Sequence, residues 1–451
     1  MHRWKLHPVI GFGFVIELLL LLLPSGAVEG GGYYFYGLGN KAGSMGYSFI
    51  GLADDPSAIY WNPAGLVQMR EREVGGGFWL MYEYAYRDNN SVANKDPRQQ
   101  PLDPREGDFF FRVRPAEPSR FRNNEVIPPL ANMADLAGHW EWKGFHFGAG
   151  YYVPIGTSLD WRDDVHPQDA RMDGRMHNLF FLAVNNVSVA RELLPGLSLG
   201  MGFNFLWGKM NQDLHKAWLD LKDPRNNYSY DMEMNAWGRG VEGVFGVLYR
   251  PTSFFQIGGV YRTGGIMNFR GRATGHHTVL NGMAGGRPRQ EGADFIWKLN
   301  HPPTWGMGLA LRPHRKLLLT LDWQHISWTK ADLRFHFRKR SSPSILFRNN
   351  IDMDTDWEEE DNFNVGLQYQ MNDRWQFRMG YGAIHGPTSG DHVGIGTLIV
   401  VDNVPTLTFG VNYTPRGPWS YGLHSEYHFE PHDRTASHNC AVLGFGVSRR
   451  F

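Results

Sequence analysis

Short runs of alternating apolar and polar residues recur along the chain after residue 73. In one of them Phe363, Val365, Leu367 and Tyr369 alternate with polar residues or glycine, and a turn at 372–374 leads into a similar run at 375–382. Because side chains of a strand point alternately to its two faces, such runs predict β-strands with one apolar face. Aromatic residues near the ends of that face, and Gly, Asn, Gln, Arg and Glu opposite, favour a lipid-facing surface and a polar lumen.

The connections between these runs alternate between short and long. Short ones are expected at 143–144, 194–196, 251–253, 313–314, 372–374 and 415–418, and long ones at 88–125, 157–175, 213–235, 271–300, 331–361, 386–404 and 431–439. Seven long and six short connections join about fourteen strands. The sequence therefore predicts an all-β protein, a transmembrane antiparallel β-barrel over residues 73–451 with short periplasmic turns and long extracellular loops.

The C-terminal run ends on an aromatic residue. Ala441, Leu443, Phe445 and Val447 share one face of the last predicted strand, and the chain ends at Phe451. A final amphipathic strand with a terminal aromatic residue resembles the signal that the barrel assembly machinery recognises. We therefore expect Phe451 to be an assembly signal and that machinery to be a partner.

Residues 1–27 have the composition of an export signal. Arg3 and Lys5 precede a leucine-rich run at 15–23, and Pro24 to Ala27 supply a small-residue cleavage region. No later stretch approaches 18 continuous apolar residues, so the mature chain could span a membrane only as a closed barrel, in which every backbone group is paired. The predicted location is the outer membrane of a Gram-negative bacterium.

Composition narrows the class of protein without deciding it. Hydrophobic residues make up 42%, aromatic residues 14%, and mean hydropathy is −0.40, with 54 glycines. This disfavours a helical membrane protein and fits a barrel with aromatic girdles, although a secreted β-sandwich would also fit. Forty-five basic and 45 acidic side chains balance, so no nucleic-acid partner is indicated. Cys440 alone excludes an intramolecular disulfide, and its apolar strand favours a structural thiol over a nucleophile.

The segment before the first strand differs from the rest. Residues 33–70 are glycine-rich and do not alternate, with helix-like pieces such as 42–51 and with Pro56 and Pro63 as breaks. The segment is too long for a leader and too apolar for a tail. We expect residues 28–72 to fold inside the barrel as a plug, here called the hatch.

The hatch sequence carries a family resemblance. Ala-Asp-Asp-Pro-Ser at 53–57 is followed by Asn-Pro-Ala-Gly-Leu at 62–66. This pair of motifs resembles the hatch of the FadL family, outer-membrane transporters of long-chain fatty acids and aromatic hydrocarbons. Similarity continues at 152–156, 188–207 and 444–447, and so covers essentially the whole mature chain. The resemblance implies a fourteen-stranded barrel, a hatch at its periplasmic end, passive uptake of apolar ligands, and a kink in the third strand that opens a lateral gap.

The resemblance also implies that one hatch turn is the gate. Asn62 can bond to its own backbone two residues on, and Pro63 biases Asn62 toward an extended conformation. A gate and a plug whose turn only helps folding are both consistent with this pattern. The hatch residues singled out are Asp54, Asp55, Trp61, Asn62, Pro63, Ala64 and Gly65.

Two further positions in these motifs allow two interpretations each. Asp54 and Asp55 could form an acid–base pair, but carboxylates before Pro56 more often cap a helix or turn. Pro154 follows an alternating run at 145–153, where its missing N–H removes a ladder hydrogen bond. It marks either a plain strand end or a kink that helps to open a lateral exit.

Other clusters are better explained without special chemistry. Asp352, Asp354 and Asp356 before acids at 358–361 resemble a calcium loop but lack its glycine and final glutamate, which favours a solvated loop over an ion-bridging one. His424 and His428 are expected on the lumen face about 13 Å apart, too far for one metal. His432 and a His276-His277 pair in a loop are equally weak, and glycine pairs at 258–259 and 264–265 lack the following helix of a nucleotide site.

These patterns together predict a passive conduit with no cofactor, no metal and no catalytic role. A hydrophobic ligand would enter above the hatch and leave when the hatch shifts, driven by removal of apolar surface from water. An outer-membrane lipase would need an exposed serine with histidine support, which the sequence does not offer. The alternative is a FadL-like barrel that binds or shuttles proteins for a secretion system. We expect a monomer, surrounded by outer-membrane lipid and lipopolysaccharide.

Overall fold

The computed structural model describes most of the chain. The described residues are 38–88, 120–127, 134–163, 170–220, 228–279, 289–330, 333–341, 346–347, 350–353, 359–384, 404–429 and 436–451. The predicted signal segment 1–27 lies outside them, as do hatch residues 28–37.

Nineteen β-segments form one antiparallel sheet, and five pairs of them are successive parts of one barrel strand. The paired segments are β2 (Arg120–Ile127) with β3 (Ala134–Trp142), β8 (Phe255–Arg262) with β9 (Gly265–Val279), β10 (Arg289–His301) with β11 (Thr304–His314), β12 (Leu317–Ile326) with β13 (Leu333–Arg338), and β14 (Ile351–Met353) with β15 (Glu360–Gln370). The others are β1 (Glu73–Asp88), β4 (Phe145–Asp163), β5 (Ala170–Leu194), β6 (Leu197–Asp220), β7 (Tyr228–Tyr249), β16 (Trp375–Ile384), β17 (Val404–Tyr413), β18 (Trp419–Phe429) and β19 (Ala436–Arg450). The predicted fourteen-stranded barrel is confirmed.

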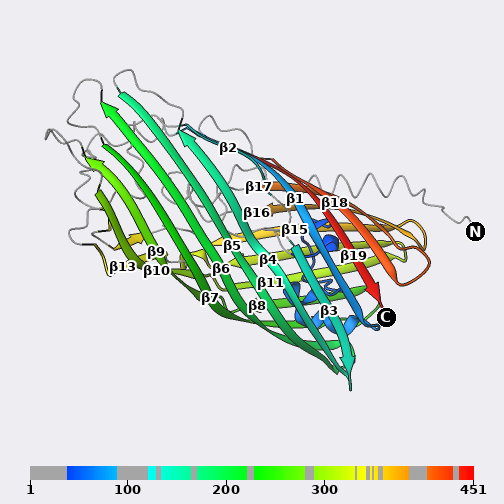
Figure 1. Cartoon of the computed structure of the whole chain (residues 1–451). Helices are drawn as coiled ribbons and strands as arrows, with labels where there is room; N and C mark the ends of the chain where they lie inside the picture. The colour runs from blue at the N-terminus through cyan, green and yellow to red at the C-terminus, as the bar shows by residue number, and fades with distance from the viewer. Residues whose placement is uncertain are drawn as a thin grey trace, which may run out of the picture.

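The barrel closes where its first and last strands meet. β1 pairs with β19 from Glu73 opposite Arg450 to Arg87 opposite Ala436. Figure 1 shows β1 (blue) and β19 (red) side by side at this seam. Closure leaves no sheet edge, as a membrane-spanning sheet requires.

One wall of the barrel is much taller than the other. β5, β6 and β7 have 25, 24 and 22 residues, whereas β16 and β17 have ten each. Figure 1 shows the long strands running far beyond the short ones at the end opposite the C-terminus.

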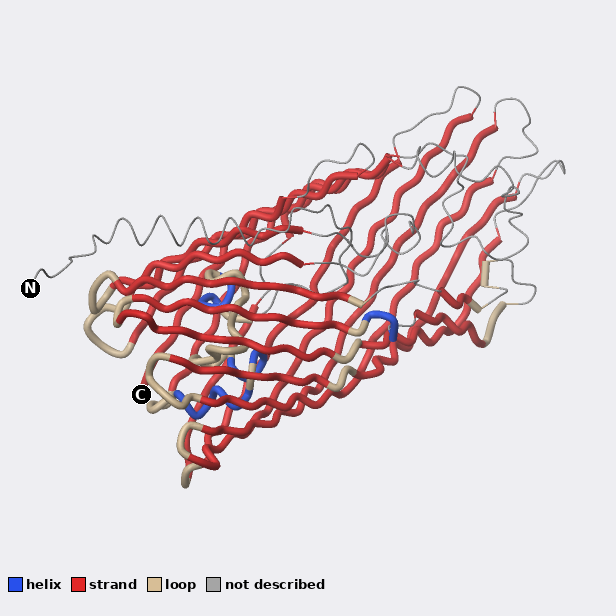
Figure 2. The backbone as a smooth tube through the Cα atoms, turned by 180° about the vertical axis from the view of Figure 1, so that it is seen from behind, coloured by secondary structure: helices blue, strands red, loops and turns tan. Residues whose placement is uncertain are grey.

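Residues 38–72 fold inside the barrel near the end that carries the short turns, as the blue helices in Figure 2 show. Their helical pieces are α2 (Asn40–Gly43), α3 (Ala58–Trp61) and the 3₁₀ helix η1 (Pro63–Gln68). The predicted helix-like piece at 42–51 is mostly turns, because Gly46 and Tyr47 both have φ of 62°, which ends the helix. No helix in these described ranges is long and apolar enough to cross a membrane.

The lumen face of the tall wall is apolar at the level of the aromatic residues, unlike the polar lumen face that the alternating runs predict. On β10 Phe295, Trp297 and Leu299 are buried on the inward face, and Lys298 between them is exposed. β9 and β10 also occupy most of the segment 271–300 that was expected to be a loop. The predicted strands end too early because the alternation reverses along them. In the upper part the apolar residues face the lumen and the polar residues face outward.

Candidate functional site

The turn at Asn62 is the best-anchored part of the hatch. The Asn62 side-chain amide donates to the carbonyl oxygen of Val247 on β7 at 2.9 Å and to that of Ile50 at 3.2 Å. Its Oδ1 accepts from the Ala64 N–H at 3.1 Å, and its backbone is extended at φ −164°. Asn62 is fully buried, so each of these bonds satisfies a group that water cannot reach.

This turn packs directly against inward-facing glycines of the barrel wall. A Cβ atom on Gly246 of β7 would lie 2.1 Å from Asn62 Oδ1, and one on Gly200 of β6 would lie 2.4 Å from the Ala64 nitrogen. Within the hatch, a Cβ on Gly65 would lie 2.1 Å from the Ala53 carbonyl oxygen. The wall and the hatch therefore meet backbone to backbone, which only glycine permits.

Trp61 connects the two ends of the described hatch. Its indole Nε1–H donates to the Leu38 carbonyl oxygen at 2.7 Å, and its ring packs edge-on against Tyr60 at 4.9 Å. Tyr60 in turn packs edge-on against Tyr152 of β4 at 5.5 Å. Trp61 therefore holds α3 to the start of the hatch and, through Tyr60, to the third barrel strand.

Asp54 and Asp55 each have a separate partner. Asp54 forms an ion pair with the Lys41 ammonium at 2.6 Å. Asp55 accepts from the Ser57 N–H at 2.9 Å and from the Ser57 hydroxyl at 2.5 Å, which fixes the turn before α3. Burial raises the pKa of the Asp55 carboxyl, and the Lys41 charge opposes that rise. This geometry matches the capping interpretation of the pair.

Three polar side chains from the wall bind hatch backbone groups. Asp322 of β12 accepts from the Ile50 N–H at 2.5 Å, Gln256 of β8 donates to the Gly51 carbonyl oxygen at 2.7 Å, and Arg262 of β8 donates to the Tyr60 carbonyl oxygen. The Arg262 guanidinium also lies 4.3 Å from the centroid of the Tyr60 ring. Sequence reasoning missed these residues. Their signal was a charged or amide side chain inside a strand, on the face opposite the lipid, where burial demands a partner.

A histidine–glutamate cluster anchors the opposite side of the hatch. Glu426 of β18 lies between His424 and His428, at 2.8 Å and 3.1 Å, and accepts a hydrogen bond from the Tyr47 hydroxyl of the hatch. The Trp79 indole nitrogen of β1 lies 3.0 Å from the same Nε2 atom of His424 that contacts Glu426. The predicted shared lumen face of the two histidines is correct, and their function here is to hold the carboxylate between them.

The other titratable clusters show no metal geometry. Within the ranges described above, no group of three or more His, Cys, Asp or Glu side chains is arranged to hold a metal ion. His277 lies on β9, not in a loop, and pairs with Glu291 at 2.9 Å. His432 and residues 354–358 of the acidic segment lie outside the described residues.

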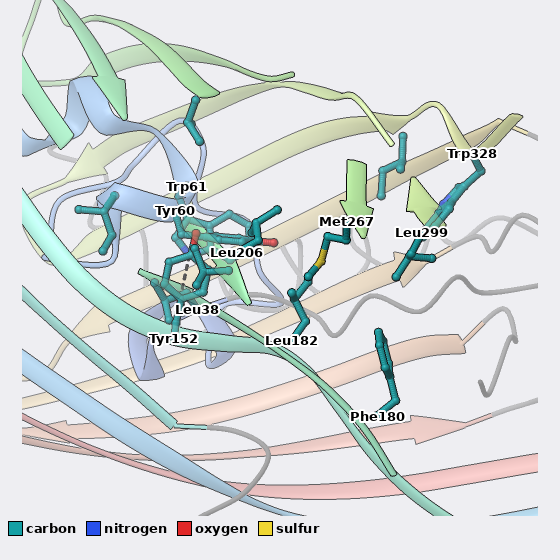
Figure 3. Packing of buried hydrophobic residues seen from close by; sticks show 14 of the residues in the cluster. Leu38, Tyr60, Trp61, Tyr152, Phe180, Leu182, Leu206, Met267, Leu299 and Trp328 are labelled. Atoms are coloured by element: carbon teal, nitrogen blue, oxygen red, sulfur yellow. Dashed lines mark hydrogen bonds between the residues drawn. The ribbon is translucent and has the colours of Figure 1, made fainter. Parts of the chain in front are cut away.

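Above the hatch, the inward face of the tall wall is apolar. Figure 3 shows a series of buried side chains leading from Tyr60 and Trp61 of the hatch past Leu206, Leu182 and Met267 toward Leu299 and Phe180. Each of these side chains is at most 6% exposed. The lumen therefore changes from hydrogen-bonding groups at the hatch to hydrocarbon above it.

Aromatic rings form the upper part of this apolar surface. Phe180 of β5 lies 5.7 Å from Phe269 of β9 and 5.5 Å from Trp297 of β10, and Trp297 stacks on Phe335 of β13 at 5.3 Å. Phe180 reaches these rings although β6 and β7 separate β5 from β9 in the sheet. We call Phe180, Phe269, Trp297 and Phe335 the aromatic cluster. Sequence reasoning missed it, and the available signal was aromatic residues alternating with arginine and lysine, which could not face lipid.

Pro154 lies inside β4, not at its end. The register of β4 against β5 shifts between Tyr152 and Ile155, so β4 carries one extra residue there. On its other side β4 pairs with β3 as far as Tyr152 and with β2 only at Arg162 and Asp163. In the part of β2 and β3 that is described, no residue pairs with 153–161. A bulge at a proline bends the strand, and beyond it residues 157–161 of β4 have no partner among the described residues of β2.

The final strand alternates as predicted. Ala441, Leu443, Phe445 and Val447 are exposed on the outward face, and Val442, between the first two, is buried. Phe451 follows β19, is 64% exposed, and donates its N–H to the Arg72 carbonyl oxygen at 2.9 Å. The terminal ring is therefore accessible at the end of the closing seam.

Comparison with known proteins identifies the family. Solved structures with the same fold include the Ralstonia pickettii toluene transporter TbuX, with TM-score 0.65 and 15% identity over 92% of this chain and 98% of that one. The P. putida toluene transporter TodX has TM-score 0.68 and 14% identity over 93% and 99%, and a Pseudomonas aeruginosa FadL homologue has 0.64 and 14% over 93% and 100%. No curated protein matches by sequence comparison.

The sequence match to a known family extends well beyond the hatch motifs. Residues 38–392 match the family described as outer membrane protein transport protein (OMPP1/FadL/TodX). The match spans the hatch and most of the barrel, and members of this family are transporters. The chain belongs to the OMPP1/FadL/TodX family of outer membrane transport proteins.

Proposed function

We propose that this protein is a passive conduit for small hydrophobic molecules in the outer membrane, and that it catalyses no reaction. The observation that carries the proposal is the apolar lumen surface that begins above the hatch and ends in the aromatic cluster. Transfer of apolar surface from water to such a wall stabilises a bound ligand by about 25 cal/mol per Å². No charged partner is needed for this binding.

Monoaromatic compounds are the ligand class that the aromatic cluster favours. Trp297 has Phe180, Phe269 and Phe335 within 4.8 to 5.5 Å of its ring centroid, distances at which aromatic rings interact favourably. A ligand ring can exchange with these contacts at little cost. TbuX and TodX are described as toluene transporters. Long-chain fatty acids, whose chains bind through the same apolar contacts, are the second ligand class.

We infer that the exit is lateral and that the hatch turn is the gate. The interrupted pairing of β4 near Pro154 lies beside Tyr152, which touches Tyr60 of the hatch. A ligand that leaves the apolar surface meets this contact before it reaches the periplasmic end. Displacement of the Asn62 turn would loosen Tyr60 and widen the same region.

The protein's surroundings follow from its location in the outer membrane. We expect a monomer that contacts outer-membrane lipid and lipopolysaccharide, and an exposed Phe451 that the assembly machinery recognises. A protein-shuttling function in secretion would place its binding surface outside the lumen. Such a function would not use the aromatic cluster.

Uptake by a variant without the bulge tests the conduit and its exit together. Deleting Pro154 removes the extra residue of β4, so regular pairing with β5 can resume, and we expect uptake of labelled toluene and oleate to fall at least tenfold. Pro195→Ala, in the short turn after β5, is the matched control and should transport normally. Heat-modifiable migration on gels checks assembly. Normal uptake by the deletion variant would exclude the lateral exit, and absence of toluene and oleate uptake in the unmodified protein would exclude the conduit.

A further inference from the structure

The tall wall carries a group of basic side chains on its outward face. Arg239 of β7, Arg270 and Arg272 of β9, Lys298 of β10, and Arg334 and Arg338 of β13 are all exposed. We call these six residues the outer basic patch. The conduit uses none of them, because they lie on the surface opposite the lumen.

Their outward direction follows from their neighbours. Phe269, Trp297 and Phe335 face inward and touch one another. Because successive side chains of a strand point to opposite faces, Arg270, Lys298 and Arg334 point outward. Gly246 of β7 faces the hatch and therefore the lumen. Arg239 is seven positions away on the same strand, an odd number, so its side chain points to the opposite, outward face.

The strand register brings these charges together. Lys298 is directly opposite Arg334 on the neighbouring strand, and Asp294 is opposite both Arg272 and Arg338. Neighbouring strands are about 4.8 Å apart, so like charges this close repel unless an anion lies between them. Two acids lie opposite these side chains in the described strands: Asp294, which is 3.0 Å from Lys339, and Asp352 of β14, which is opposite Arg334.

The patch begins where the lipid-facing surface ends. Outward positions of β7 are apolar or glycine from Tyr249 to Val241, and Arg239 is the first charged one. At about 3.3 Å per residue and about 40° of tilt, Tyr249 and Arg239 differ in height by about 25 Å, the thickness of the apolar band of such barrels. Trp207 and Trp237 stack at 6.4 Å at this level, as interfacial tryptophans do.

The sign of the outward charge changes just beyond the patch. Asp213 and Glu233 are paired neighbours one row farther out, and Asp231 lies 2.5 Å from His215 in the row after that. The basic side chains are thus confined to a narrow zone between the apolar band and an acidic one. A zone of this height and sign matches the phosphate layer of the outer leaflet.

We propose that the outer basic patch binds the phosphorylated headgroup of lipopolysaccharide. Arginine presents a planar fork of N–H donors that fits phosphate oxygens in a bidentate manner, and five of the six residues are arginines. Phosphate groups beside Lys298, Arg270 and Arg272 relieve the repulsion within the patch. The bound headgroup fixes the height of the tall wall in the membrane. This inference rests on the proposed outer-membrane location and not on the ligand transported.

Lipid binding by a charge-neutralised patch tests the proposal. The patch variant is Arg270→Gln, Arg272→Gln and Lys298→Gln, and the matched control is Arg250→Gln, Arg315→Gln and Arg416→Gln, three exposed arginines in the short turns at the other end. Purified proteins in nanodiscs are titrated with diphosphorylated lipid A, with dephosphorylated lipid A and with phosphatidylglycerol. The unmodified protein and the control should bind diphosphorylated lipid A at least tenfold more tightly than the patch variant, and dephosphorylated lipid A weakly.

The outcomes separate this proposal from the proposed function. Equal binding by patch variant and control, or equal affinity of the unmodified protein for phosphatidylglycerol and lipid A, would overturn the lipopolysaccharide site. Toluene uptake is measured in parallel in phospholipid vesicles that contain no lipopolysaccharide, where the patch variant should transport like the unmodified protein. Lipid A binding without any toluene or oleate uptake would support the patch and exclude the conduit.

Discussion

The lower and upper parts of the tall wall use the same strands with opposite polarity. On β7, Gly246 and Glu242 face inward near the hatch, while Phe245 and Val241 face lipid. Farther along the strand Met234 is buried inward, and Glu233 is exposed outward. The alternation is uninterrupted, but the surroundings on both sides change. Lipid requires apolar side chains only along the membrane band, and polar groups face the lumen at the hatch because the hatch supplies hydrogen-bonding partners.

This comparison separates two functions of the lumen face. The hatch level holds a segment of the chain in one position through directional bonds and close backbone packing. The aromatic cluster above it offers apolar, non-directional contacts, which suit a ligand that must leave again. The following predictions test whether the two levels act separately.

The largest effect is expected at the glycine that receives the hatch. Gly246→Ala places a methyl group 2.1 Å from Asn62 Oδ1, so the turn must move, at a cost of about 3 kcal/mol. We expect a displaced hatch, with increased leakage of polar dyes through an assembled barrel. Gly259→Ala on β8 is the control, because its nearest contact, a Val247 methyl group at 3.2 Å, can give way. Equal leakage from both variants would show that the hatch is not held at Gly246.

Removal of aromatic rings should affect uptake and leave the hatch in place. Phe180→Ala with Trp297→Ala opens the aromatic cluster, and loss of about 1.4 kcal/mol of ligand stabilisation corresponds to a tenfold fall in toluene uptake. Leakage of polar dyes should stay at the level of the unmodified protein. Phe205→Ala, an outward-facing aromatic residue of β6, should change neither quantity. If the double variant transports toluene normally, the upper level does not bind the ligand.

A change in the hatch turn distinguishes a gate from a structural plug. Asn62→Ala with Pro63→Ala removes the bonds to Val247 and Ile50 and takes away the acceptor of the buried Ala64 N–H, at about 1–3 kcal/mol. A gate requires normal barrel assembly with a several-fold change in uptake of labelled fatty acid or toluene. Unchanged uptake by a properly assembled variant would identify the turn as a folding element only.

The smallest effect concerns pH and Asp55. Burial raises the pKa of Asp55 in the folded hatch, so the folded state binds a proton over a range of pH in which the unfolded state does not. Stability of the hatch therefore falls as pH rises from the usual aspartate pKa through the raised one. Asp55→Asn should remove this dependence. The measurement is hydrogen exchange in peptides covering residues 54–62, corrected for intrinsic rates, and an equal slope in both proteins would contradict the assignment.

Much of the hatch could be predicted because its signals are local. Pro63 restricts the backbone of Asn62, and the Asn62 side-chain oxygen accepts a hydrogen bond from the Ala64 N–H two residues away. Sequence alone therefore indicates this turn. The partners of the turn could not be predicted in the same way. Val247 is 185 positions along the chain from Asn62, and one sequence carries no record of such a contact.

The sequence by itself determined the class of fold. Period-two alternation, short turns and the absence of a long apolar helix fix strands, their approximate number and the face that meets lipid along the membrane band, because these depend on neighbouring residues and on the solvent. Only the tertiary structure decided which inward groups meet the hatch, that β4 carries an extra residue at Pro154, and that Phe180 joins Trp297 across three intervening strands. The reason is that closure of the barrel sets which distant residues face each other, and the polarity of a face follows from what it meets.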